Sequence, residues 1–119
     1  MSSDADLIAG AKAYVDALAS HDPSAVPFHP DCVRIEMGVK TGRSGDHLRR
    51  SLSRGPQYKV IHAISEFQAR VEGRTVHVTF YVNVQPKPLG LRSKVIESFE
   101  FDESGQIKKI VAKFGVPHR

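Results

Sequence analysis

The spacing of apolar residues changes about halfway along this chain. Between positions 7 and 18, apolar side chains recur every three or four residues, which is the period of one face of an α-helix. From about position 58 onward, apolar and polar side chains alternate instead, which is the period of a β-strand. We therefore expect helices first and then a twisted antiparallel sheet, an α+β arrangement whose curved sheet and covering helices enclose a cone-shaped ligand pocket.

Capping and turn residues divide these two halves into elements. The predicted helices are Leu7–Leu18, a short one with Asp22 as N-cap and Pro23 at its first position, and one capped by Asp46 that ends near Ser53. The predicted strands are Cys32–Met37, Tyr58–Glu66, Phe67–Val71, Thr75–Val84, Leu91–Phe101 and Ile107–Phe114, with loops at Gly38–Gly45 and Pro86–Gly90.

Length and composition limit the classes of protein that fit. A chain of 119 residues and 13.1 kDa predicts one domain, 1–119. No apolar run reaches the roughly 20 residues that cross a bilayer, and the acidic N-terminus has no apolar signal region, so we expect a cytoplasmic protein without membrane contact. A single cysteine, Cys32, excludes an internal disulfide and a cysteine metal cluster.

Charge and motifs give little support to other partners. The net charge of +4 comes with a basic segment between positions 43 and 59, but no nucleic-acid-binding motif accompanies it, so a solvated basic face is favoured over nucleic acid. The histidines lack the paired spacing of a metal site, and the glycines form neither a P-loop nor a dinucleotide fingerprint. We therefore predict no metal and no cofactor.

One carboxyl group falls on the wrong face of a predicted strand. Glu97 shares the apolar face of its strand with Val95 and Phe99. Burial there disfavours the charged form of a carboxyl group and raises its pKa, so Glu97 can stay protonated and donate a hydrogen bond. A glutamate at the sheet edge, or one paired with a basic side chain, fits the same pattern.

Two more polar residues are candidates on weaker signals. Tyr14 lies in the apolar stripe of the first helix, where its hydroxyl needs a partner, although an ordinary core tyrosine fits equally well. Glu36 lies on the strand face opposite Val33 and Ile35, and the pattern does not say which face meets the cavity. A solvated carboxylate is the alternative for Glu36.

Several segments together resemble the ketosteroid isomerase branch of the NTF2-like, or SnoaL-like, superfamily. The segments are A-Y-V-D-A-L-A-S-H-D at 13–22, F-H-P-D-C-V-R-I-E-M at 28–37, G-R-S-G at 42–45, E-S-F-E-F-D-E-S-G-Q-I at 97–107 and A-K-F-G at 112–115. The resemblance runs nearly end to end. It implies the NTF2-like cone, with N-terminal helices packed on a strongly curved antiparallel or mixed sheet around a ligand pocket, and a homodimer paired through the outer sheet face.

The resemblance also implies residue roles. Tyr14 aligns with the family's oxyanion-hole tyrosine, Glu36 with its catalytic aspartate base, and Glu97 with the aspartic acid that is kept neutral in an apolar site. Leu52 and Phe114 fall near the apolar ring-binding wall. Both family aspartates are glutamates here, and Leu52 replaces a residue that is usually aromatic, so the resemblance leaves the substrate open.

The implied activity is proton transfer that shifts a double bond in a steroid-like or other apolar ketone through a dienolate. The alternative is a non-catalytic NTF2-like protein that binds a hydrophobic small molecule in the same cavity. An epoxide hydrolase of this fold is less favoured, because its hallmark is an Asp-Arg-Asp arrangement and the basic residues Arg92 and Lys94 face away from Glu97.

Overall fold

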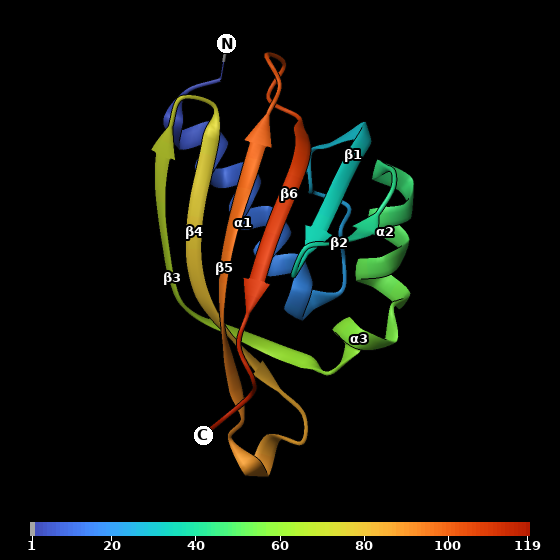
Figure 1. Ribbon diagram of the computed structural model, residues 1–119, viewed down its shortest axis with the longest axis vertical. Coiled ribbons are helices and arrows are strands. Elements are labelled where there is room, and N and C mark those ends of the chain that lie inside the picture. Colours follow the sequence, from blue (N-terminus) through green and yellow to red (C-terminus); the bar gives the residue numbers. More distant parts are fainter. Residues whose placement is uncertain (1) are drawn as a thin grey trace.

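The computed structural model describes residues 2–119 as a curved six-stranded sheet with helices against its concave side (Figure 1). This confirms the predicted α+β class. The elements in chain order are α1 (Asp4–Ser20), β1 (Phe28–Glu36), β2 (Val39–Gly42), α2 (Gly45–Arg54), α3 (Pro56–Lys59), β3 (Ile61–Glu72), β4 (Thr75–Val84), the short 3₁₀ helix η1 (Lys87–Leu89), β5 (Arg92–Phe101) and β6 (Ile107–Phe114).

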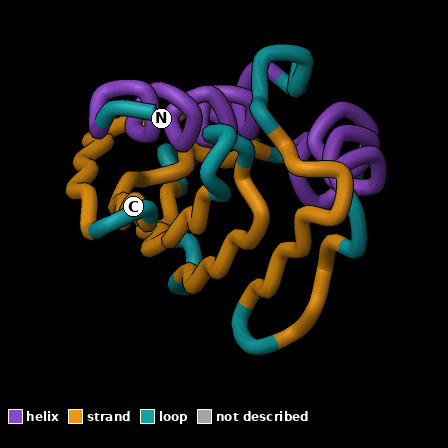
Figure 2. Tube along the Cα trace, turned by 90° about the horizontal axis from the view of Figure 1, so that it is seen from above, coloured by secondary structure: helices purple, strands orange, loops and turns teal. Residues whose placement is uncertain are grey.

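The sheet is mixed, with the strand order β2-β1-β6-β5-β4-β3. β1 and β6 pair in parallel, and every other neighbouring pair is antiparallel. Seen from above, the strands form an open arc beneath the helices (Figure 2). Because β6 lies between β1 and β5, side chains from the two ends of the chain meet on the concave face.

α1 covers the concave face and supplies much of the core. Its start is fixed by a capping box, in which Ser3 and Asp6 each accept a hydrogen bond from the other's backbone N–H. The apolar stripe predicted from the sequence lies on the buried face of this helix, except that Ile8 is only partly buried and Ala17 is buried as well. The buried residues are Leu7, Ala11, Tyr14, Val15, Ala17 and Leu18. This stripe packs against buried strand residues such as Phe80 and Phe99.

β5 shows the predicted alternation along its whole length. Ser93, Val95, Glu97, Phe99 and Phe101 are buried, and the residues between them are at least partly exposed. Glu97 therefore faces the concave side of the sheet, as the pattern predicted. No helix within residues 2–119 is both long and apolar enough to cross a membrane.

The predicted short helix at Asp22 and Pro23 is wrong. The segment is a turn, in which the Asp22 side chain accepts a hydrogen bond from the backbone N–H of Ser24 at 3.1 Å. An aspartate that bonds the backbone two residues later offers the chain an alternative to a helix. The loop predicted at Gly38–Gly45 is also partly wrong, because β2 occupies Val39–Gly42 and pairs with β1.

Strand boundaries differ from the prediction as well, since β1 begins at Phe28 and not at Cys32. Tyr58 belongs to α3 instead of starting a strand, since Pro56 at the first helical position begins a new turn. The two strands predicted between positions 58 and 71 are one strand, β3, which is interrupted by a bulge at Glu66 with a φ of 56°. A bulge shifts the alternation by one residue, which made one strand look like two.

Candidate active site

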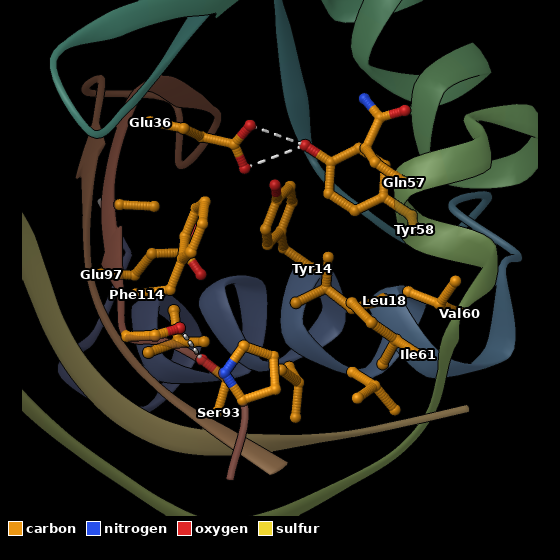
Figure 3. Close-up of a pocket in the computed structure, with 16 residues that line it drawn as sticks. Tyr14, Leu18, Glu36, Gln57, Tyr58, Val60, Ile61, Ser93, Glu97 and Phe114 are labelled. Atoms are coloured by element: carbon orange, nitrogen blue, oxygen red, sulfur yellow. Dashed lines mark hydrogen bonds between the residues drawn. The ribbon is translucent and has the colours of Figure 1, made fainter. Parts of the chain in front are cut away.

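The concave face of the sheet, α1 and α3 enclose a cavity of about 290 Å³. Its lining is mostly apolar, with a few polar groups that point toward the same space (Figure 3). The polar lining residues are Tyr14, Glu36, Gln57, Tyr58, Ser93 and Glu97, and the apolar ones include Leu18, Ile61, Val82, Val95, Ala112 and Phe114. An apolar pocket with few converging polar groups is the usual form of a small-molecule site.

Glu97 is a buried carboxyl group with no hydrogen-bond partner within residues 2–119. Its side chain belongs to the middle of β5, and the whole residue is only 4% exposed. Burial, and to a lesser degree repulsion from Glu36, raises the pKa of Glu97 to about 8, against the opposing effect of Arg34. At neutral pH Glu97 is therefore mostly protonated and carries a proton that it can donate into the cavity.

Glu36 is held in an environment of the opposite kind. The hydroxyl of Tyr58 lies 2.9 Å from both of its carboxylate oxygens, so one proton is shared between them (Figure 3). The Nε of Arg34 lies 3.7 Å from Oε1. Both contacts bring a donor group to this carboxyl, whereas Glu97 has none among residues 2–119. The two glutamates therefore face one cavity in unlike surroundings.

Tyr14 brings a third polar group to the cavity from α1. Its ring is 1% exposed and packs edge-on against Phe28 and Phe99, with centroids 6.0 and 5.3 Å away. The hydroxyl oxygen accepts a hydrogen bond of 3.1 Å from Nη1 of Arg34, while the hydroxyl proton has no acceptor within the described part of the chain. Burial, followed by the nearby Glu97, raises the pKa of Tyr14, so the phenol stays neutral and keeps its proton for a ligand.

The structure adds two residues that the sequence pattern did not single out. Arg34 is fully buried between Cys32 and Glu36 on the inner face of β1, and it carries the guanidinium next to the site. Tyr58 holds Glu36 from α3. The inward face of β1 carries Arg34 and Glu36 beside the buried Phe28 and Cys32, whereas the partly exposed Val33 and Ile35 lie on the other face. The sequence signal for Arg34 was its position two residues before Glu36, on the same face.

The remaining two predicted residues lie in different places. Phe114, at the end of β6, lines the cavity and is 47% exposed, so it belongs to the rim. Leu52 is fully buried on α2 and is not among the residues that line the cavity. The structure thus brings Tyr14, Glu36, Glu97 and Phe114 together and places Leu52 in the hydrophobic core.

Comparison with solved structures shows which fold the chain has. A steroid delta-isomerase from Pseudomonas aeruginosa is similar with a TM-score of 0.67 and 22% identity, over 95% of this chain and 82% of the other. An LEH-like epoxide hydrolase from M. tuberculosis is similar with a TM-score of 0.70 and 20% identity, over 93% of this chain and 84% of the other. An NTF-2 like protein of unknown function from Burkholderia xenovorans LB400 is similar with a TM-score of 0.72 and 15% identity, over 98% of this chain and 88% of the other. The chain has the NTF2-like cone fold, as the resemblance implied.

The sequence also matches one family model. Residues 1–114 match the family described as Domain of unknown function (DUF8021), and the chain belongs to this family. No curated protein matches the chain at a significant level.

Proposed function

We propose that this protein is an acid–base enzyme that shifts a double bond in an apolar ketone through a dienolate, in the manner of a ketosteroid isomerase. One observation carries the proposal. Glu36 and Glu97 face the same apolar cavity in unlike surroundings. Tyr58 and Arg34 bring donor groups to Glu36, whereas Glu97 has no such partner among the described residues and its pKa of about 8 keeps it mostly neutral at pH 7. Two carboxyl groups in unlike surroundings at one site are typical of an acid and base pair.

The proton path follows from these positions. Glu36 removes a proton from the carbon beside the ketone, and the electron pair of the broken C–H bond moves onto the ketone oxygen. Tyr14 and neutral Glu97 donate hydrogen bonds to that oxygen, where negative charge develops. Glu36 then returns the proton to the far carbon of the former double bond, which leaves the conjugated ketone and the carboxylate unchanged.

The cavity limits the substrate to an apolar molecule of modest size. Its volume of about 290 Å³ lies just below the range of roughly 300–1,000 Å³ that is usual for ligand pockets. The rim residues Val60 and Phe114 are 44% and 47% exposed, so a longer substrate would extend between them into solvent. A series of ketones from one ring to four therefore tests the site better than a steroid alone.

The test is a turnover assay with β,γ-unsaturated cyclic ketones, from cyclohex-3-enone to a 3-ketosteroid, followed by the growth of ultraviolet enone absorbance. We expect turnover of at least one member and its loss in Glu36→Gln, which keeps the shape of the side chain but not its basicity. Turnover that persists in Glu36→Gln would contradict the assigned base.

A second candidate activity, epoxide hydrolysis, has one observation in its favour. The buried Arg34 lies beside Glu36, so an arginine lies next to one of the two carboxyl groups, although it does not itself line the cavity. Glu36 would take a proton from water as the water attacks an epoxide carbon, and Glu97 would give its proton to the epoxide oxygen as the C–O bond breaks. Diol formation from small apolar epoxides, without any ketone isomerisation, would favour this activity.

A non-catalytic role in binding a hydrophobic small molecule is the third candidate. It predicts tight binding of apolar ketones with no product from either substrate class.

The homodimer through the outer sheet face stays a prediction as well. The exposed Ile96, 54% accessible on that face of β5, is in keeping with it, and the mass measured by light scattering would test it.

A further inference from the structure

The buried guanidinium of Arg34 serves no part of the proton path described above, yet it is the largest side chain that is fully buried in the described residues. Arg34 does not line the cavity. It contacts three residues that do line it. The hydroxyl oxygen of Tyr14 accepts a hydrogen bond from Nη1, Oε1 of Glu36 lies 3.7 Å from Nε, and the ring of Tyr58 lies against the guanidinium. A buried charge is costly unless it is paired and hydrogen-bonded, so its contacts require a reason.

The position of Arg34 is fixed mainly by hydrogen bonds to residues that do not line the cavity. Its Nε donates to Oγ1 of Thr41 at 3.0 Å, and its Nη2 donates to the Thr41 carbonyl and to Oγ of Ser51, both at 3.2 Å. The guanidinium also lies over the ring of Tyr58, 4.8 Å from the centroid. β2 and α2 therefore hold the planar group still, and Nη1 is directed at Tyr14.

This contact decides which way the Tyr14 hydroxyl can act. A phenol hydroxyl has one proton and also accepts hydrogen bonds. Because Arg34 occupies the oxygen as a donor, the proton of Tyr14 must go to a different partner, and no acceptor for it exists within residues 2–119. The proton is left for a ligand oxygen, and the positive charge behind the hydroxyl makes it a stronger donor.

We propose that Arg34 is a positioning residue for Tyr14. By donating to the Tyr14 oxygen it leaves the Tyr14 hydroxyl to act as a hydrogen-bond donor toward the cavity, and its positive charge strengthens the bond that this hydroxyl donates to an anionic oxygen of the ligand. This inference rests on the proposed function, since it concerns the same cavity. It further identifies the ligand class as one with an enolate-like or phenolate-like oxygen in an otherwise apolar body. It needs no turnover to be tested.

The test uses phenols as probes of that oxygen. At a pH where 4-nitrophenol is ionised and 4-cresol is not, we expect the wild type to bind 4-nitrophenolate more tightly than 4-cresol. Arg34→Gln should reduce this preference by about tenfold or more, because a charge near the oxygen is lost in a site of low dielectric. Calorimetry or fluorescence titration gives both dissociation constants for each variant.

Arg49→Gln is the matched control. Arg49 is also tied to backbone carbonyls, those of Pro23 and Val26, and lies over the ring of Phe28, but it has no contact with Tyr14. We expect the phenolate preference of this variant to equal that of the wild type, even where its thermal stability falls. A loss of preference in Arg49→Gln equal to that in Arg34→Gln would assign Arg34 a merely structural role.

Tyr14→Phe keeps the test decisive if Arg34→Gln does not fold. Without the hydroxyl, Arg34 has no hydrogen-bonded link to the ligand, so this variant should lose the preference for 4-nitrophenolate too. A preference that survives in Tyr14→Phe or in folded Arg34→Gln, or that is absent from the wild type, overturns the inference. An absence of isomerase turnover alongside a preference that depends on Arg34 would overturn the proposed function and leave this inference standing.

Discussion

Glu36 and Glu97 lie opposite the same residue, Ala112, because β6 pairs with β1 on one side and with β5 on the other. Neighbouring strands are about 4.8 Å apart, so the two backbones are separated by roughly 10 Å. Between them is only the methyl group of Ala112, which is 3% exposed and lines the cavity. The register of three strands thus sets the distance between the proposed base and the proposed acid and leaves room for a ligand.

The protonation of Glu97 predicts how stability depends on pH. Its pKa is about 8 in the folded chain and near the ordinary 4.5 in the unfolded chain, so the folded state binds the extra proton. Its contribution to stability is fully present below pH 4.5 and is lost as the pH rises to about 8, with a limiting slope of about 1.4 kcal/mol per pH unit. We expect Glu97→Gln to flatten this decline in urea titrations at several pH values. An equal decline in wild type and variant would assign it to other groups.

A larger side chain at position 112 should fill part of the cavity without disturbing the fold. Ala112→Val places two more carbons between Glu36 and Glu97, in space that the cavity leaves open. We expect at least a tenfold weaker affinity for apolar ketones or phenols, with a change in the free energy of unfolding below about 1 kcal/mol. Val111→Leu, which adds one carbon on the outer face of the same strand, is the control and should bind as the wild type does.

The hydrogen bonds from Tyr58 to Glu36 lead us to expect that loss of the Tyr58 hydroxyl lowers kcat but not substrate affinity. Tyr58→Phe removes the hydroxyl that holds both oxygens of Glu36 but keeps the ring that lines the cavity. A misoriented base slows proton abstraction, so kcat should fall by about tenfold or more while KM changes little. Tyr81→Phe is the control, since Tyr81 lies on the outer face under Arg92, 4.2 Å from its guanidinium carbon. A matching rise in KM in Tyr58→Phe would instead assign Tyr58 to substrate binding.

A substitution at Leu52 should change stability but not ligand affinity. The side chain is fully buried on α2 and lies outside the lining of the cavity. Leu52→Ala should therefore cost about 2–5 kcal/mol of unfolding free energy, because it leaves a void in the core, while the affinity of the folded protein for ligand stays the same. Phe114→Ala, at the rim, should have the opposite effect, with weaker binding and little loss of stability. Weaker binding by folded Leu52→Ala would return Leu52 to the binding wall.

Periodic signals predicted the local structure well. The helical stripe of α1 and the alternation along β5 follow directly from apolar spacing, so the spacing alone places both Tyr14 and Glu97 on inward faces. The boundaries near Asp22, Tyr58 and Glu66 do not follow from it, because a side-chain-capped turn, a helix restarted at Pro56 and a bulge each interrupt the period locally.

The sequence pattern did not predict which face of β1 is buried or which residues share the cavity, and the tertiary structure decided both. On β1 the polar Arg34 and Glu36 lie on the inward face together with the apolar Phe28 and Cys32, while Val33 and Ile35 are turned outward, because Arg34 and Glu36 find partners in the interior. An alternating pattern identifies two faces but does not say which one is buried when polar groups pair inside. Sequence alone determined most of the elements and the anomalous Glu97. Only the pairing of β1 with β6 and of β6 with β5, contacts between distant segments, decided that Glu36 and Glu97 share one cavity.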